Sequence, residues 1–299
     1  MNRLALALLT VFTVCFLNES VAFAGEGLFS RVYTTETVPA GRFEIEEAIR
    51  NRNGRAYGSY SAFDSKSEFE YGFTDNFQGA LYVNTGYISA QGAPDDDEPD
   101  GSTAMGFTRS GWFQQSISAE FIYRVLSPVK DPIGLAFYFE PEFDFTDLHN
   151  GKRFDRTMSN EYRVLVQKNF LDDQLILAYN LVFEIEFIRF EGDPTWKGEL
   201  DWNNEIGLTY RVMSNWYAGL EARNHNEVSN FEAHDHSVYW AGPAVHYANE
   251  RFWATLGVLR QVYGEPTGTG PDGNSIGDNH LFLRSHELWE TTLKVAVTF

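Results

Sequence analysis

Seven histidines are the side chains best suited to acid–base chemistry in this sequence of 299 residues. A serine hydrolase needs a serine activated by a histidine, with a third polar group that orients the imidazole. Ser285 precedes His286, but the sequence has no Gly-x-Ser-x-Gly elbow. We expect the histidines of the polar segments to be solvated, and we predict no catalytic residue. The histidines are His149, His225, His234, His236, His246, His280 and His286.

Paired acidic residues raise a second possible chemistry, that of a glycosidase. Glu140 and Glu142 form one pair, and Glu184 and Glu186 form another. Residues two apart on a strand share one face at a separation of about 7 Å, so any strand with a polar face produces such pairs. The pairs therefore carry little information about catalysis.

Metal binding has two candidate segments. His234-Asp235-His236 would place two imidazoles on one side of an extended chain, and His225 is close in sequence. Asp95-Asp96-Asp97-Glu98, followed by Asp100, offers the oxygen ligands that Ca²⁺ prefers. Neither segment has the spacing of an EF-hand or a zinc site, so we predict no metal site and no cofactor.

The charge balance excludes one class of partner. The chain has 42 acidic and 23 basic residues, which gives a formal net charge of −19. Nucleic-acid phosphates would repel such a chain, so we predict no nucleic-acid partner. Hydrophobic residues make up 43% of the chain and aromatic residues 16%, the composition of a folded protein.

The first 24 residues have the features of a secretory signal peptide. Arg3 precedes an apolar run from Leu4 to Leu17, and Ala22-Phe23-Ala24 has the pattern of a cleavage site. We expect residues 25–299 to form one mature domain without a thiol, because the single cysteine, Cys15, lies in the signal peptide. No later apolar stretch is long enough for a transmembrane helix. A soluble exported β-protein and a transmembrane β-barrel remain as alternatives.

Alternation with a period of two recurs after Gly25 and favours strands. The clearest examples, 133–146 and 174–188, are longer than the usual soluble strand of ~5–6 residues. They match the ~9–11 residues of a tilted membrane strand with an overhang. Short turns alternate with longer polar segments, which are 53–59, 88–111, 147–158, 190–199, 224–237 and 262–285.

The alternation of short turns and longer polar segments predicts an all-β fold, a transmembrane antiparallel up-and-down β-barrel of about twelve strands. Both termini would then lie on the periplasmic side. The expected strand centres are Ile45, Glu68, Val83, Phe121, Phe139, Val164, Leu181, Glu205, Leu220, Ala244, Leu256 and Val295.

Two segments carry a resemblance to known proteins. Leu293, Val295, Val297 and the terminal Phe299 occupy alternate positions, and this resembles the C-terminal assembly signal of Gram-negative outer-membrane proteins. Glu70–Gln78 is similar to a strand–turn–strand motif of poorly characterised outer-membrane transporters, including meta-pathway phenol-degradation transporters. The resemblance to porin-type barrels implies an outer-membrane location. It also implies contact with membrane lipid, lipopolysaccharide and the outer-membrane protein assembly machinery.

The polar faces of the strands would line the lumen. Alternation directs 16 acidic and nine basic residues inward, so the lumen would be net acidic. Glu47 and Asn204 fall on the predicted lipid face, which means that the register slips there or that they lie beyond the apolar band. The candidate lumen-lining residues are Glu140, Glu142, Asp144, Glu184, Glu186, Arg124, Arg163, Arg211 and Arg223.

These features predict a channel or transporter for passive passage of small solutes, with a preference for cations. Twelve strands fall between the filled interior of about eight strands and the open lumen of about 16–18. A structural barrel with a plugged lumen therefore stays an alternative. An outer-membrane lipid hydrolase and a soluble secreted β-protein are the others.

Overall fold

The computed structural model describes residues 26–94, 106–266 and 280–299. The expected signal peptide and the acidic segment at 95–100 lie outside the described residues. The strands are β1 (Phe43–Asn53), β2 (Ser59–Thr74), β3 (Phe77–Ala93), β4 (Phe107–Leu126), β5 (Gly134–Asp144), β6 (Phe154–Phe170), β7 (Leu175–Phe190), β8 (Lys197–Met213), β9 (Trp216–Ser229), β10 (Ala233–Ala248), β11 (Phe252–Pro266) and β12 (Trp289–Thr298).

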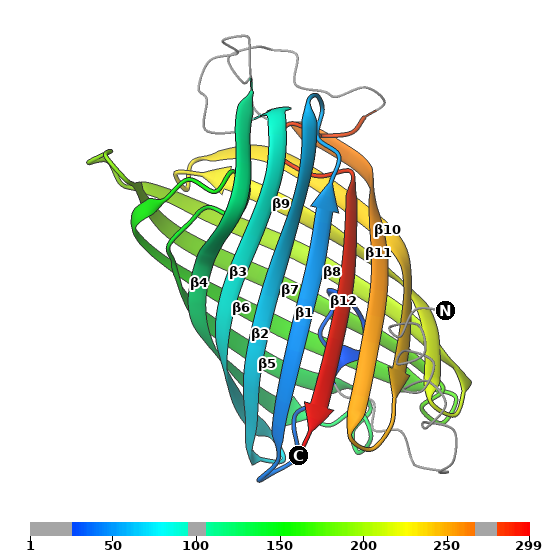
Figure 1. The fold of residues 1–299 in the computed structure, drawn as a ribbon. Coiled ribbons are helices and arrows are strands. Elements are labelled where there is room, and N and C mark those ends of the chain that lie inside the picture. The colour runs from blue at the N-terminus through cyan, green and yellow to red at the C-terminus, as the bar shows by residue number, and fades with distance from the viewer. Residues whose placement is uncertain (1–25, 95–105, 267–279) are drawn as a thin grey trace, which may run out of the picture.

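These strands form one closed antiparallel barrel, in which β1 pairs with both β2 and β12 (Figure 1). The prediction of a twelve-stranded up-and-down barrel is confirmed, and every expected strand centre lies within a strand. The helical element η1 (Glu26–Leu28) is a single 3-10 turn. Among the described residues, no helix is long and apolar enough to cross a bilayer.

The strands extend beyond the ends that were predicted from the polar segments. Residues 224–229 belong to β9 and 233–237 to β10, so that only 230–232 connect the two strands. Likewise 88–93 extend β3 and 107–111 extend β4. The alternation of apolar and polar residues is lost where both faces of a strand are polar, although the backbone hydrogen bonds between the strands continue. The predicted loop bounds were therefore wrong at these ends.

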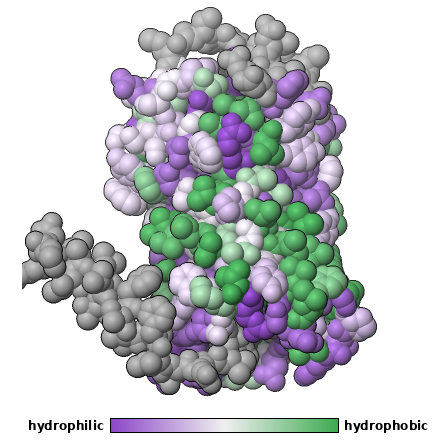
Figure 2. Space-filling view, turned by 90° about the vertical axis from the view of Figure 1, so that its right-hand side faces the viewer, coloured by the Kyte–Doolittle hydropathy of each residue, from purple (hydrophilic) through white to green (hydrophobic). Residues whose placement is uncertain are grey.

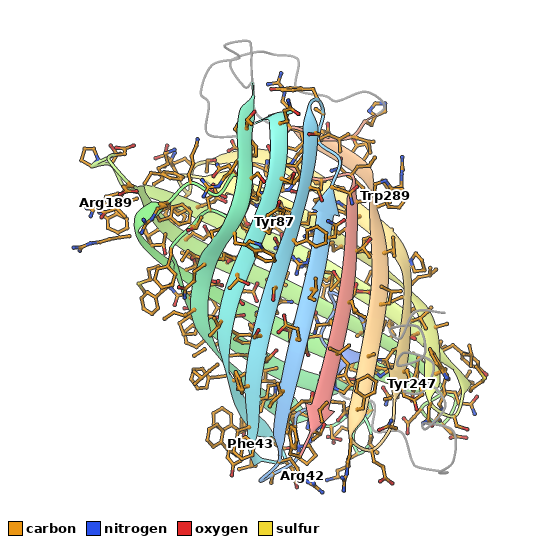
Figure 3. All side chains as sticks on the ribbon, viewed as in Figure 1. Arg42, Phe43, Tyr87, Arg189, Tyr247 and Trp289 are labelled. Carbon is orange, nitrogen blue, oxygen red and sulfur yellow. The ribbon has the colours of Figure 1, made fainter. Side chains whose placement is uncertain are left out.

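The outer face of the barrel carries an apolar band. Leu81, Leu220 and Leu256 are exposed there and alternate with buried residues. Figure 2 shows hydrophobic residues gathered across the middle of one face, with hydrophilic residues toward both ends. In Figure 3, Tyr87 and Trp289 lie toward the upper end of the barrel, while Phe43 and Tyr247 lie toward the lower end. An apolar band between two aromatic levels is typical of a bilayer-spanning barrel.

Glu47 and Asn204 lie on this outer face without any slip in register, because the pairing of β1 with β2 and of β7 with β8 is continuous. Glu47 accepts hydrogen bonds from the Ser65 and Ser67 hydroxyls, at 2.5 and 2.6 Å. Asn204 accepts one from Tyr179 at 2.6 Å and donates one to Asn224 at 2.8 Å. Local partners thus offset the cost of polar groups on this face.

The part of the segment before β1 that covers residues 26–38 lies inside the barrel, and we call it the plug; residues 39–42 are exposed beside the turn between β2 and β3. Its dark blue ribbon is visible within the barrel behind β1 and β12 in Figure 1. Leu28, Phe29 and Val32 are buried against Ile176 of β7 and Tyr217 of β9. No sequence pattern predicted this arrangement, because a short segment without alternation carries no signal of what surrounds it.

Candidate functional site: the barrel lumen

Polar side chains of the barrel wall hold the plug in place. Glu221 of β9 accepts hydrogen bonds from the backbone N–H groups of Ser30 and Arg31, both at 2.8 Å. Asn180 of β7 accepts one from the Tyr33 N–H at 2.7 Å and donates one to the Tyr33 carbonyl at 2.8 Å. The wall therefore supplies the partners that a β-sheet neighbour would otherwise give to this extended backbone.

Two glutamines continue the same pattern toward β1. Gln167 of β6 accepts from the Thr35 N–H at 2.9 Å, and Gln78 of β3 accepts from the Val38 N–H at 2.7 Å. The four wall residues stand on β9, β7, β6 and β3, so the plug crosses the lumen from one side to the other.

Side chains fill the interior beside the plug. Tyr82, Ile122 and Leu165 are almost completely buried, as is the carboxylate of Glu120. These side chains pack beside the plug at a level toward the end where β12 terminates. We call that end the C-terminal rim and the opposite end the loop rim.

A polar cavity of about 590 Å³ occupies the lumen on the side of the loop rim. Thirteen acidic and seven basic residues are among those that line it, so the described lining is net acidic. Residues 145–153, between β5 and β6, and residues 280–288, before β12, also contribute to its lining.

Glu287 anchors the second of these segments. Its Oε1 lies 2.7 Å from Nη1 of Arg52 and 2.8 Å from Nη2 of Arg55. Burial alone would raise the pKa of the Glu287 carboxyl, but the two guanidinium groups hold the pKa well below its usual range. Arg52 also binds Asp64 at 2.7 Å and the Leu148 carbonyl at 2.8 Å, which joins both segments to β1 and β2.

Charges of both signs line the cavity on all sides, with arginines of β1 facing carboxylates of β7. Arg50 and Arg52 stand on β1, while Glu184 and Glu186 stand on β7, six strands away in a ring of twelve. Arg31 of the plug is one of six arginines in the lining. The Nε atoms of Arg31 and Arg50 are buried without a hydrogen-bond partner.

Six of the nine predicted lumen residues line this cavity, namely Glu142, Asp144, Glu184, Glu186, Arg163 and Arg223. Glu140 is buried instead, at 3.1 Å from the Lys66 ammonium. Arg124 pairs with Glu36 of the plug at 2.8 Å, and Arg211 contacts the Asp172 carbonyl at 3.4 Å, near a turn. A role for any of them in solute passage stays a prediction.

The predicted assembly signal belongs to the end of the barrel. Leu293, Val295 and Val297 alternate along β12, where Leu293 and Val297 are exposed on the outer face. Phe299 donates its backbone N–H to the Phe43 carbonyl at 2.8 Å. Recognition of these residues by an assembly machinery stays a prediction.

The expectation of solvated loop histidines was wrong for two of them. His236 of β10 and His286 of the segment 280–288 are buried, with 3% and 7% of their surface exposed. His246 is also buried, deeper along β10. His149 remains partly exposed, with 43% of its side chain accessible within the lumen cavity.

One serine on the outer face contacts a histidine. The Ser237 hydroxyl lies 3.2 Å from Nε2 of His234, and it donates a hydrogen bond to the Asn226 amide oxygen at 2.7 Å. The hydroxyl proton is therefore directed to Asn226 and away from the imidazole. A general base must accept that proton, so this arrangement is not a catalytic triad as it stands.

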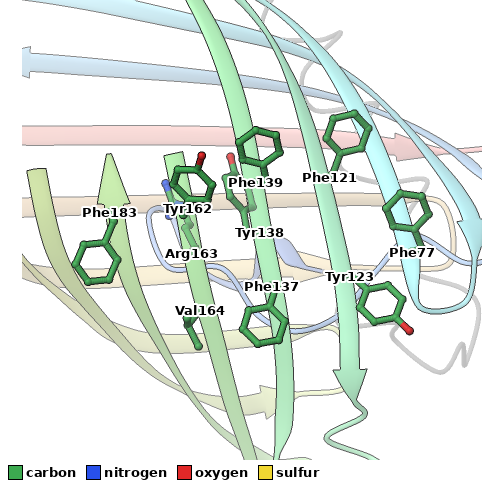
Figure 4. Close-up of a pocket in the computed structure, with 10 residues that line it drawn as sticks. All are labelled: Phe77, Phe121, Tyr123, Phe137, Tyr138, Phe139, Tyr162, Arg163, Val164 and Phe183. Carbon is green, nitrogen blue, oxygen red and sulfur yellow. The ribbon is translucent and has the colours of Figure 1, made fainter. Parts of the chain in front are cut away.

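An aromatic groove of about 350 Å³ lies across β3 to β7. Figure 4 shows its rings, among them Phe77, Phe121, Phe139 and Phe183. Phe121 and Phe183 are exposed and belong to the apolar outer face. We assign the groove to the lipid contact surface and keep the lumen as the candidate site.

The family described as "Family of unknown function (DUF6662)" matches residues 21–299. The chain belongs to this family. No match is found among curated proteins. The description of the DUF6662 family names no activity, so the family assigns none to the cavity.

Among solved structures, the chain is similar to the COG4313 outer membrane channel from Pseudomonas putida F1, with a TM-score of 0.56 and 10% identity over 89% of this chain and 98% of that chain. Lower scores relate it to the NanC porin (TM-score 0.45, 9% identity, 86% and 98% covered) and the KdgM porin (TM-score 0.43, 10% identity, 86% and 98% covered). The likeness to the first shows a shared barrel fold.

Proposed function

We propose that this protein is an outer-membrane channel for small polar solutes, and that the plug must shift for a solute to pass. The observation that carries the proposal is the polar, net acidic cavity, which is enclosed by the barrel and separated from the C-terminal rim by the plug. The barrel fold shared with an outer membrane channel supports the same function.

The contacts of the plug allow it to move. It is held by non-covalent contacts alone: hydrogen bonds to Glu221, Asn180, Gln167 and Gln78, the ion pair between Glu36 and Arg124, and apolar packing around Phe29 and Tyr33. Residues 25–299 contain no cysteine, so no disulfide fixes the plug to the wall. Local segments with few buried apolar contacts open at a lower free energy than the strands around them.

The charge of the lining sets the expected selectivity. An excess of carboxylates raises the local concentration of cations and lowers that of anions. The guanidinium groups on β1 and the carboxylates on β7 would in addition orient solutes that carry a positive and a negative charge. We therefore expect passage of small cations and zwitterions ahead of anions.

Solute flux into proteoliposomes tests this function. Vesicles that contain the folded protein are placed in iso-osmotic solutions of a small amino acid, a monosaccharide and a large oligosaccharide. We expect swelling with the two small solutes and none with the oligosaccharide. If no small solute causes swelling, either with wild type or with Glu221→Ala, in which the plug should be released, the barrel is purely structural.

The contact between Ser237 and His234 leaves a second candidate to be tested, a hydrolase acting on lipid at the outer face, although the Ser237 proton is directed to Asn226 in this structure. Release of the Ser237 hydroxyl from Asn226 would leave His234 as the base that accepts its proton. A fluorophosphonate probe, which reacts with activated serines, distinguishes the two functions. Labelling that is lost in Ser237→Ala supports the hydrolase, and absence of labelling in the folded protein refutes it.

A further inference from the structure

Three histidines from distant parts of the sequence meet at the loop rim. His225 stands on β9, His236 on β10 and His286 on the segment 280–288. One ligand atom of each lies within 4.8 Å of the corresponding atoms of the other two. The ring centroids are 4.7 Å apart for His236 and His286, and 4.9 Å apart for His225 and His286.

The contact between His236 and His286 is made by their Nε2 atoms, which are 2.6 Å apart. Two imidazole nitrogens at this distance must share one proton between them, since one donates and the other accepts. A bound metal ion would replace that shared proton. Both rings are buried, so their orientation is set by the surrounding structure.

The separations suit a tetrahedral metal ion after a small adjustment. Zn²⁺ binds imidazole nitrogen at about 2.0–2.1 Å, which places two nitrogens of a tetrahedral site about 3.3 Å apart. His236 and His286 must therefore separate by less than about 1 Å, and His225 must approach by up to about 1.5 Å. His286 belongs to a segment outside the strands, where such a shift is tolerated.

Carboxylates complete the surroundings of the three rings. Oε2 of Glu227 lies 3.6 Å from Nε2 of His236, within reach of a fourth ligand position. Oδ2 of Asp201 lies 3.6 Å from Nδ1 of His225, where a carboxylate can orient a ligating imidazole. Asp201, Glu227, His225 and His286 also line the lumen cavity, which gives an ion a route from solvent.

We propose that His225, His236 and His286 form a binding site for a divalent transition metal ion, with Zn²⁺ as the ion of matching geometry and Glu227 as the fourth ligand. The site joins β9, β10 and the segment 280–288, so a bound ion would hold that segment at the loop rim. The proposal does not depend on conduction, because the three histidines would lie in the same place in a conducting channel and in a closed barrel.

Calorimetric titration of the EDTA-treated protein with Zn²⁺ tests this site. We expect one ion per chain for wild type and a loss of affinity of at least about 100-fold in His236→Gln and in His286→Gln. His280→Asn is the control on the same segment, because His280 has a left-handed backbone (φ 61°) that asparagine also adopts. His246→Gln is the control for a buried histidine on β10. Both controls should bind like wild type.

A second measurement uses the unmodified protein, in case a variant fails to fold. Zn²⁺ should protect His225, His236 and His286 from modification by diethylpyrocarbonate, and His280 should react equally with and without Zn²⁺. The proposal is overturned if wild type shows no binding, if the two site variants bind as tightly as the controls, or if Zn²⁺ protects none of the three histidines.

Discussion

Replacing Glu221 with alanine should release the plug from the barrel wall. The Glu221 carboxylate accepts the backbone N–H groups of Ser30 and Arg31, both at 2.8 Å. A hydrogen bond to a charged group contributes about 1.5–3 kcal/mol, so the two together contribute about 3–6 kcal/mol. Removal of a buried charge also removes its desolvation cost, and for this reason we use the lower figure. A change of about 3 kcal/mol corresponds to roughly 100-fold in the population of the released plug.

A single cysteine reports this release. Because residues 25–299 contain no cysteine, Val32→Cys introduces the only thiol of this part of the chain. Val32 is 2% exposed in the apolar cluster, and cysteine is a small apolar replacement. The rate of maleimide labelling then follows the fraction of time that the plug is open. We expect Val32→Cys to react about 100-fold faster when Glu221→Ala is added.

Two further variants make the result decisive. Glu221→Gln keeps one acceptor oxygen and loses the charge. With glutamine at 221, Val32→Cys should therefore be labelled faster than with glutamate and more slowly than with alanine. A cysteine at the exposed residue Glu250 should react quickly in every background. If Val32→Cys is labelled at the same rate whether residue 221 is glutamate or alanine, these two hydrogen bonds do not hold the plug. That result would refute the reasoning.

Three other predictions concern the rest of the barrel. Glu287→Ala leaves the guanidinium groups of Arg52 and Arg55 buried without this partner, which should cost about 3–5 kcal/mol in urea unfolding followed by gel mobility; an unchanged midpoint would contradict this. Gly72→Ala would place a Cβ atom 2.3 Å from the carbonyl oxygens of Val38 and Pro39, so residues 38–42 should shift and become sensitive to protease, while Gly111→Ala, with open space around it, should resist like wild type. Deletion of Phe299 should slow insertion into the outer membrane in cells, and normal insertion would refute its role as an assembly signal.

The barrel could be predicted from the sequence because one physical pattern governs every strand. Alternation of apolar and polar residues follows from a wall between lipid and water, and it gave all twelve strands and the inward orientation of Glu142, Glu184 and Arg163. The strand ends could not be predicted, because above the apolar band both faces meet polar surroundings. His236 at the start of β10 was assigned to a loop for that reason.

The plug could not be predicted, and of the histidine cluster only His225 and His236 were grouped from the sequence, since the plug contacts and the approach of His286 depend on distant segments. Glu221 and Asn180 look like ordinary inward polar residues, and nothing in the sequence marks them as partners of Ser30 and Tyr33. His286 follows a polar segment, yet it is buried against His236 because the Glu287 ion pairs hold its segment in the lumen.

Single-channel recording in planar lipid bilayers tests the central proposal most directly. The proposal predicts brief cation-preferring openings for wild type, longer openings of the same preference for Glu221→Ala, and a weaker cation preference when Glu184 and Glu186 are both replaced by glutamine. The absence of conductance in folded wild type and folded Glu221→Ala, or a clear preference for anions, would contradict it.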